Sequence, residues 1–205
     1  MDFHTKLSSP SVREQALAAI FLHAEGANGA PHLTALLQSC QAIDTTKDLD
    51  RFEEALLGRG AMAMGDIVSA IGFDPQNALH VSILRWIMQS TLSRNINVAA
   101  LSIYGLGNLG VSNPETSECL RRLVTSERRS NEHEHVSLRA IALRALRRID
   151  PEIAAKFVEA TSFEEYIHAV EYWLSTNLPM SDETRLKLQN ELEWLTRTRE
   201  RRTNR

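Results

Sequence analysis

The fold is decided by two stretches of the sequence that match when one is shifted by 40 residues: INVAALSIYGLGNLG at 96–110 and VSLRAIALRALRRID at 136–150. Apolar residues coincide at 96/136, 98/138, 101/141, 106/146 and 109/149, and alanines coincide at 100/140. At about 100° per residue, the second stretch gathers its apolar side chains on one side of a helix. These are Leu138, Ile141, Ala142, Ala145, Leu146 and Ile149, and the opposite side carries Arg144, Arg147 and Arg148. A period near 40 residues predicts stacked helix pairs.

The repeat extends outward from these two stretches. Pro75, Pro114 and Pro151 are spaced by 39 and 37 residues, and a weaker copy, VREQALAAI, stands at 12–20. The VREQA opening and the GLGNLG ending at 105–110 resemble the second helix of HEAT repeats, well over 75–160 and loosely over 11–43. The resemblance implies an all-α, right-handed α-solenoid of antiparallel helix pairs. We expect one domain over 1–199, followed by a basic, disordered tail at 200–205.

Prolines and glycines mark the ends of the expected helices. Each proline stands before or at the opening of an apolar run, where its missing N–H leaves no intrahelical partner unsatisfied. Glycines close several runs, as C-caps do. No segment alternates like a strand. The predicted helices are 11–25, 31–43, 50–71 (with a break considered at Gly58-Arg59-Gly60), 75–93, 96–110, 114–126, 134–149, 151–160, 163–177 and 182–199.

Composition and charge limit the functional classes. The 205 residues are 43% hydrophobic and 24% charged, as in a globular protein. The net charge of −3 divides into four blocks: −4 over 1–93, +4 over 94–149, −7 over 150–196 and +4 over 197–205. This mixture argues against a continuous basic stripe for nucleic acid. Two distant cysteines, no long apolar run and no secretory signal lead us to expect a cytoplasmic protein without a membrane partner.

The candidate site follows from the 40-residue offset. Tyr104, Gly107 and Asn108 share their positions with Arg144, Arg147 and Arg148, on the side of each helix away from its apolar face. If the resemblance holds, the second helices line the concave side of the array. Tyr104, Asn108, Arg144, Arg147 and Arg148 then form a groove floor, where guanidinium groups bind carboxylates or phosphates. The simpler interpretation is a basic helix face paired within the chain, for example with Glu171 or Glu165.

The leading hypothesis is therefore a non-enzymatic adaptor, inhibitor or immunity-type protein that binds another protein with an acidic surface. A nucleic-acid-binding or DNA-repair protein is one alternative, and an accessory lyase or cofactor chaperone is another. His133 and His135 lack a third ligand and are assigned to a polar loop, so we expect neither a metal nor a cofactor. No sequence motif of phosphate binding or nucleophilic catalysis is present.

Overall fold

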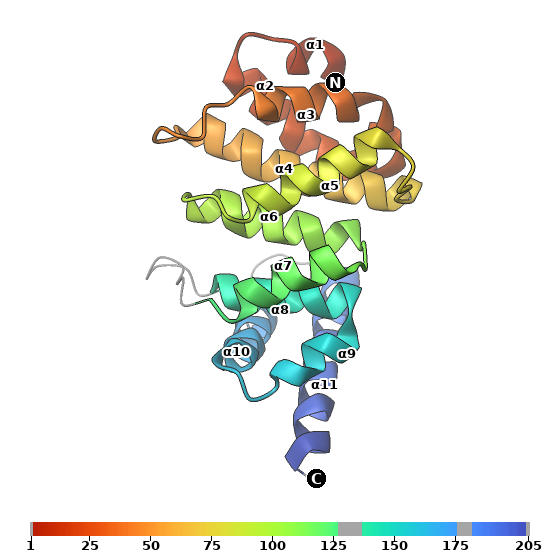
Figure 1. The fold of residues 1–205 in the computed structure, drawn as a ribbon, viewed down its shortest axis with the longest axis vertical. Helices are drawn as coiled ribbons and strands as arrows, with labels where there is room; N and C mark the ends of the chain where they lie inside the picture. Colours follow the sequence, from red (N-terminus) through yellow and green to blue (C-terminus); the bar gives the residue numbers. More distant parts are fainter. Residues whose placement is uncertain (1, 127–136, 176–181, 204–205) are drawn as a thin grey trace. The chain divides into compact units, whose positions relative to one another are not determined.

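The computed structural model describes residues 2–126, 137–175 and 182–203, and these residues are helical without a strand. The elements are α1 (Phe3–Leu7), α2 (Val12–Leu22), the 3₁₀ segment η1 (His23–His32), α3 (Leu33–Gln41), α4 (Arg51–Ile71), α5 (Ala78–Ser90), α6 (Ile96–Leu109), α7 (Pro114–Val124), α8 (Leu138–Ile149), α9 (Pro151–Ala154), η2 (Ala155–Phe157), α10 (Thr161–Ser175) and α11 (Asp182–Thr203) (Figure 1). The all-α class is confirmed.

The chain divides into two compact units, Met1–Cys119 and Leu120–Arg205, with the boundary inside α7. We describe each unit by itself. The expectation of one domain over 1–199 stays a prediction. The last helix continues to Thr203, four residues beyond its predicted end.

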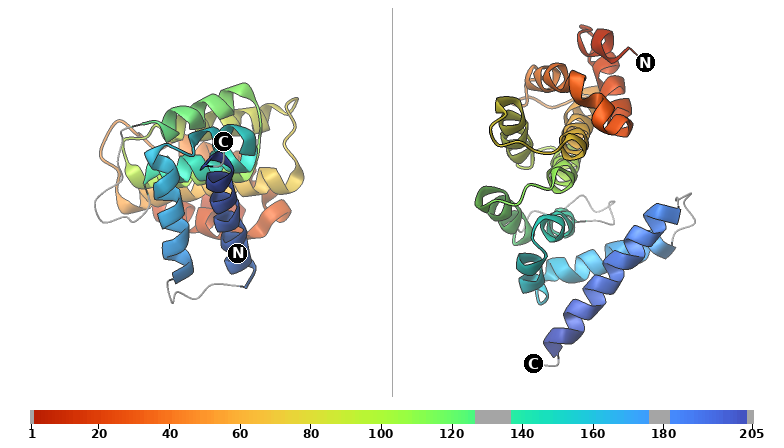
Figure 2. Two further views of the ribbon diagram at one scale, coloured as in Figure 1. Left: turned by 90° about the horizontal axis from the view of Figure 1, so that it is seen from below. Right: turned by 90° about the vertical axis from the view of Figure 1, so that its right-hand side faces the viewer.

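In the first unit, α2, α4 and α6 form one layer, and α3 and α5 pack against α4 and α6 from a second layer (Figures 1 and 2). Residue pairs show that neighbouring helices of the first layer run in the same direction. The guanidinium of Arg13 lies over the ring of Phe52 near the start of α2 and α4, and His23, directly after the end of α2, pairs with Asp66 near the end of α4. Leu101 next to Gly58 and Gly105 next to Gly65 give α4 and α6 the same direction. Parallel helices within one layer are what stacked helix pairs produce.

Glycines set the distance between α4 and α6. A methyl group added to Gly65 would lie 2.2 Å from the carbonyl oxygen of Gly105, and one added to Gly105 would lie 2.4 Å from that of Ala61. The two backbones therefore touch at a crossing that only glycine permits. This contact explains why α6 has glycine at position 105. The break considered at Gly58-Arg59-Gly60 does not occur, and α4 is continuous through these residues. Gly60 packs against the Cys40 sulfur.

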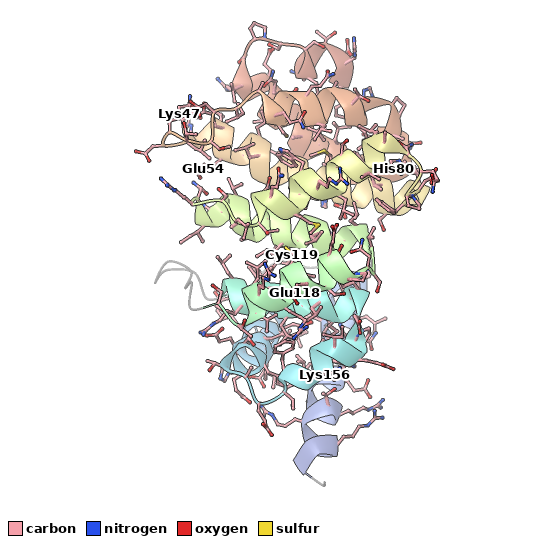
Figure 3. All side chains as sticks on the ribbon, in the orientation of Figure 1. Lys47, Glu54, His80, Glu118, Cys119 and Lys156 are labelled. Atoms are coloured by element: carbon pink, nitrogen blue, oxygen red, sulfur yellow. The ribbon has the colours of Figure 1, made fainter. Side chains whose placement is uncertain are left out.

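Helix ends follow the local sequence closely. The Asp50 carboxylate accepts hydrogen bonds from the backbone N–H groups of Phe52 and Glu53, and Glu53 in turn accepts from the backbone N–H of Asp50. This reciprocal pair is a capping box. Backbone donors hold the pKa of both carboxyls below their ordinary values. Lys47 pairs with Glu53 and lies at the same end of α4 as Glu54 (Figure 3).

In the second unit, α8 buries the apolar face that its periodicity predicts, from Leu138 to Ile149. Its N-cap is Ser137, whose hydroxyl accepts from the N–H of Ala140. Helices α8 and α10 pack together, and α11 packs along α10 (Figure 2). Glu165 near the start of α10 accepts from both Ser137 and Arg139, which ties the beginnings of α8 and α10 together.

Candidate protein-binding surfaces

The five predicted contact residues belong to different units. Tyr104 and Asn108 are half-buried side chains of α6 in the first unit. Arg144 and Arg147 are half-buried and Arg148 is exposed, all on α8 in the second unit. In both helices they lie opposite the buried face, as the periodicity predicts. A joint groove floor of all five stays a prediction.

Arg144 is engaged within the chain. Its Nε and Nη2 atoms donate to the two carboxylate oxygens of Glu191 on α11, at 2.8 and 2.9 Å. The hydroxyl of Tyr166, on α10, donates to the same carboxylate at 3.1 Å. Burial, together with the nearby Glu191 charge, raises the pKa of Tyr166, so its phenol keeps its proton and remains a donor. Glu191 is only 5% exposed, so its carboxylate is shielded from water, while Arg144 remains half-buried.

Arg147 contacts an aromatic group of α11, the helix that carries Glu191. Its guanidinium carbon lies 4.9 Å from the centre of the Trp194 ring, within the range of a cation–π contact. The Trp194 ring is 6.3 Å from that of Phe163 on α10. The partners named from the sequence, Glu165 and Glu171, bind elsewhere: Glu165 pairs with Arg139, and Glu171 with His168. The sequence predicts intramolecular partners for this basic face, and for Arg144 the structure identifies Glu191 on α11.

A second surface, which the sequence did not reveal, lies on the first unit. Partly exposed side chains recur every three or four residues along α4, and they join similar stripes on α2 and α6. Arg13 over Phe52 links α2 to α4, and Leu101 packed against Gly58 links α4 to α6. We call this the α2–α4–α6 face. Its members are Arg13, Leu17, Ile20, Phe52, Arg59, Met62, Tyr104 and Asn108.

This face is apolar and aromatic with basic groups among its members. Leu17 and Ile20 are 37% and 40% exposed, although both are large aliphatic residues in a regular helix. Adjacent exposed apolar side chains on a folded domain are typical of protein-binding surfaces. Arginine and aromatic side chains are the residues enriched where proteins bind each other. Tyr104 and Asn108 form its α6 edge, so part of the sequence prediction falls on this face.

The first unit also has a hollow of about 320 Å³ where α5 turns into α6. The Trp86 indole and the Arg94 guanidinium are its largest side chains. The remaining lining residues are Thr45, Leu57, Gln89, Ser90, Leu92, Ser93 and Val98. The hollow has no histidine, cysteine or carboxylate in its lining, so its residues offer contacts but no acid–base pair.

In the described part of the chain, no three His, Cys, Asp or Glu side chains converge to form a metal site. His133 and His135, weighed from the sequence as metal ligands, lie outside the described residues. Within the described ranges, no helix is both long and apolar enough to cross a membrane. Cys40 is buried, and burial raises the pKa of its thiol, so its sulfur is a packing group.

Comparison with known proteins gives no relative: no family model, no curated sequence and no solved structure matches this chain. Its own geometry is therefore the basis for a functional assignment.

Proposed function

We propose that this protein is a non-enzymatic helical-repeat module that binds another protein, acting as an adaptor, inhibitor or immunity-type protein. The observation that carries the proposal is the α2–α4–α6 face, where three parallel helices join their exposed stripes. We further propose that the helix pairs continue as a right-handed, HEAT-like α-solenoid. The common direction of α2, α4 and α6 supports it.

The chemistry of the face favours a partner with apolar side chains flanked by carboxylates. Leu17, Ile20 and Met62 offer apolar contact, while Arg13 and Arg59 offer guanidinium donors. Apolar contact supplies most of the affinity in such interfaces, and charge pairs set orientation and association rate. We place this interaction in the cytoplasm, which accords with Cys40 and Cys119 standing as thiols.

The experiment is affinity purification from native cells with tagged full-length variants. A stoichiometric protein should co-purify with the wild type and be lost with Arg59→Glu or with Tyr104→Ala. Arg85→Glu is the matched control, because Arg85 is exposed on α5 in the other layer. Equal recovery from all variants would contradict the assignment of this face.

The same purification tests the nucleic-acid alternative. Its motivation is the basic tail and the set of arginines at 121, 122, 128, 129, 139, 144, 147 and 148. Nucleic acid that co-purifies and is released steeply by added salt would replace the protein-binding proposal. Nothing in the described residues favours the lyase or cofactor-chaperone alternative.

A further inference from the structure

The helix α11 lies on the side of α8 that the repeat register assigns to binding. Arg144 and Arg147 correspond to Tyr104 and Gly107 at the 40-residue offset, and both arginines contact α11. On α6, Tyr104 is part of an exposed face. On α8, the corresponding position is covered by a helix of the same chain.

The contact has the form of a helix bound in a groove. One stripe of α11 faces inward: Leu188, Glu191 and Leu195 are buried and Trp194 is half-buried. These positions are three or four residues apart, which is the anchor spacing of amphipathic helices that bind in grooves. Most of the other described side chains of α11 are exposed. The helix is therefore attached through a narrow set of anchors.

The groove that receives these anchors is specific in its chemistry. Arg144 and Tyr166 together supply three hydrogen bonds to one carboxylate. A planar guanidinium selects a carboxylate through two parallel bonds. Three residues further along α11, the Trp194 ring lies against Phe163 and under Arg147. The groove therefore recognises a glutamate followed, three positions later, by a tryptophan on the same helix face.

We infer that this groove, formed by Arg144, Arg147, Phe163 and Tyr166, is a binding site for amphipathic helices that carry a glutamate and a tryptophan three positions apart on one face, and that α11 is its resident ligand. A partner protein carries a helix with the same Glu–Trp spacing and replaces α11. The inference deepens the proposed function and rests on it for the existence of a partner. The exchange itself can be tested without that partner.

The test uses full-length protein and a fluorescent peptide of residues 182–203, with binding followed by anisotropy. A tethered helix competes at an effective concentration near the millimolar range, so the wild type should bind the peptide weakly. Weakening the resident helix by Glu191→Gln should raise the affinity for the peptide by about tenfold or more, because less competition remains. A peptide that itself carries Glu191→Ala should bind poorly to the same variant.

Glu193→Gln is the matched control, because Glu193 lies on the exposed side of α11 and pairs with Arg197 of the same helix. It should leave peptide binding at the wild-type level. The inference is overturned if Glu191→Gln binds the peptide no better than Glu193→Gln does. It is also overturned if peptides with and without the glutamate bind equally.

Hydrogen exchange on the wild type covers the case in which Glu191→Gln fails to fold. Amides of α11 should exchange through a local opening, faster than those of α8 and α10. Equal protection of the three helices would make α11 an integral part of the fold and overturn the inference. If the peptide exchanges but no protein co-purifies from cells, the groove stands and the proposed function fails. If a protein co-purifies but the peptide does not bind, the partner binds the α2–α4–α6 face alone.

Discussion

Replacing Gly65 by alanine should destabilise the first unit, because the crossing of α4 and α6 has no room for a methyl group. The added Cβ would lie 2.2 Å from the Gly105 carbonyl oxygen and 2.9 Å from its carbon. Even weak C–H···O contacts need about 3.3 Å, so the two helices must separate by about 1 Å. Both obstructing atoms belong to a helix backbone, which cannot rotate away as a side chain can.

Two opposing terms set the size of the effect. Overpacking a buried contact costs about 1–3 kcal/mol, and a backbone obstacle places Gly65→Ala in the upper part of that range. Alanine returns up to about 1 kcal/mol through its higher helix propensity. The expected net loss is about 1–2 kcal/mol in the free energy of unfolding. Gly105→Ala meets the Ala61 carbonyl oxygen at 2.4 Å and should behave in the same way.

Urea unfolding followed by far-ultraviolet circular dichroism measures this loss. For a slope of about 2 kcal/mol per molar, the midpoint should fall by about half to one molar. The control is Gly58→Ala on the same helix, where the nearest obstacle at 2.6 Å is the end of the Leu101 side chain. A rotamer change moves the Leu101 Cδ1 away, and the Leu101 Cβ at 3.2 Å has to give by only a few tenths of an ångström, so this variant should lose less stability than Gly65→Ala. Wild-type stability for Gly65→Ala would refute the close-crossing argument.

Three further outcomes are expected. The pKa of Asp50 is lowered by backbone N–H donors, so its stabilising contribution is present above its ordinary pKa of 3.8 and is lost as the pH falls through the lowered value. Asp50→Asn, which keeps a cap acceptor, should therefore lose less stability than the wild type between about pH 5 and about pH 3, measured by urea midpoints at each pH. A disulfide reagent should modify Cys119 before the buried Cys40. The reaction of Cys40 should follow global unfolding, and rapid modification of both thiols would contradict the packing described. Tyr166→Phe removes one hydrogen bond to the buried Glu191 carboxylate and should cost about 1–3 kcal/mol of stability, whereas Tyr172→Phe, an exposed position of the same helix, should cost little.

The helices could be predicted because their signals are local. The apolar period of 138–149 identifies the buried side of α8, and Gly110 closes α6 at φ = +72°. Two helices begin later than their prolines predict. A helix was predicted from Pro75, but α5 begins at Ala78, because the Asn77 side chain caps it by accepting from the N–H groups of Leu79 and His80. Likewise α3 begins at Leu33, two residues after Pro31, since the 3₁₀ segment η1 continues to His32.

The candidate site was harder to predict because periodicity identifies the exposed side of a helix but not the element that covers it. In the sequence, Glu191 is one of several charges in a polar helix, and no local pattern distinguishes it from Glu193. Only tertiary contact makes the first a buried partner of Arg144 and leaves the second on the surface. The α2–α4–α6 face was missed for a related reason. Its members come from three helices whose order in space the sequence does not state.

The two stretches that match at the 40-residue offset differ at the positions where we propose binding. Where α8 has Arg144 and Arg147, α6 has Tyr104 and Gly107, so a glutamate and a tryptophan spaced as on α11 find their guanidinium partners only on α8. Conversely, the Gly105 that lets α6 touch α4 becomes Ala145 on α8, which excludes so close a crossing there. A few differences between the two stretches thus give corresponding positions of α6 and α8 different contacts. One copy closes against α4 and keeps the half-buried Tyr104 at its edge, and the other holds α11 through the ion pair of Arg144 with Glu191.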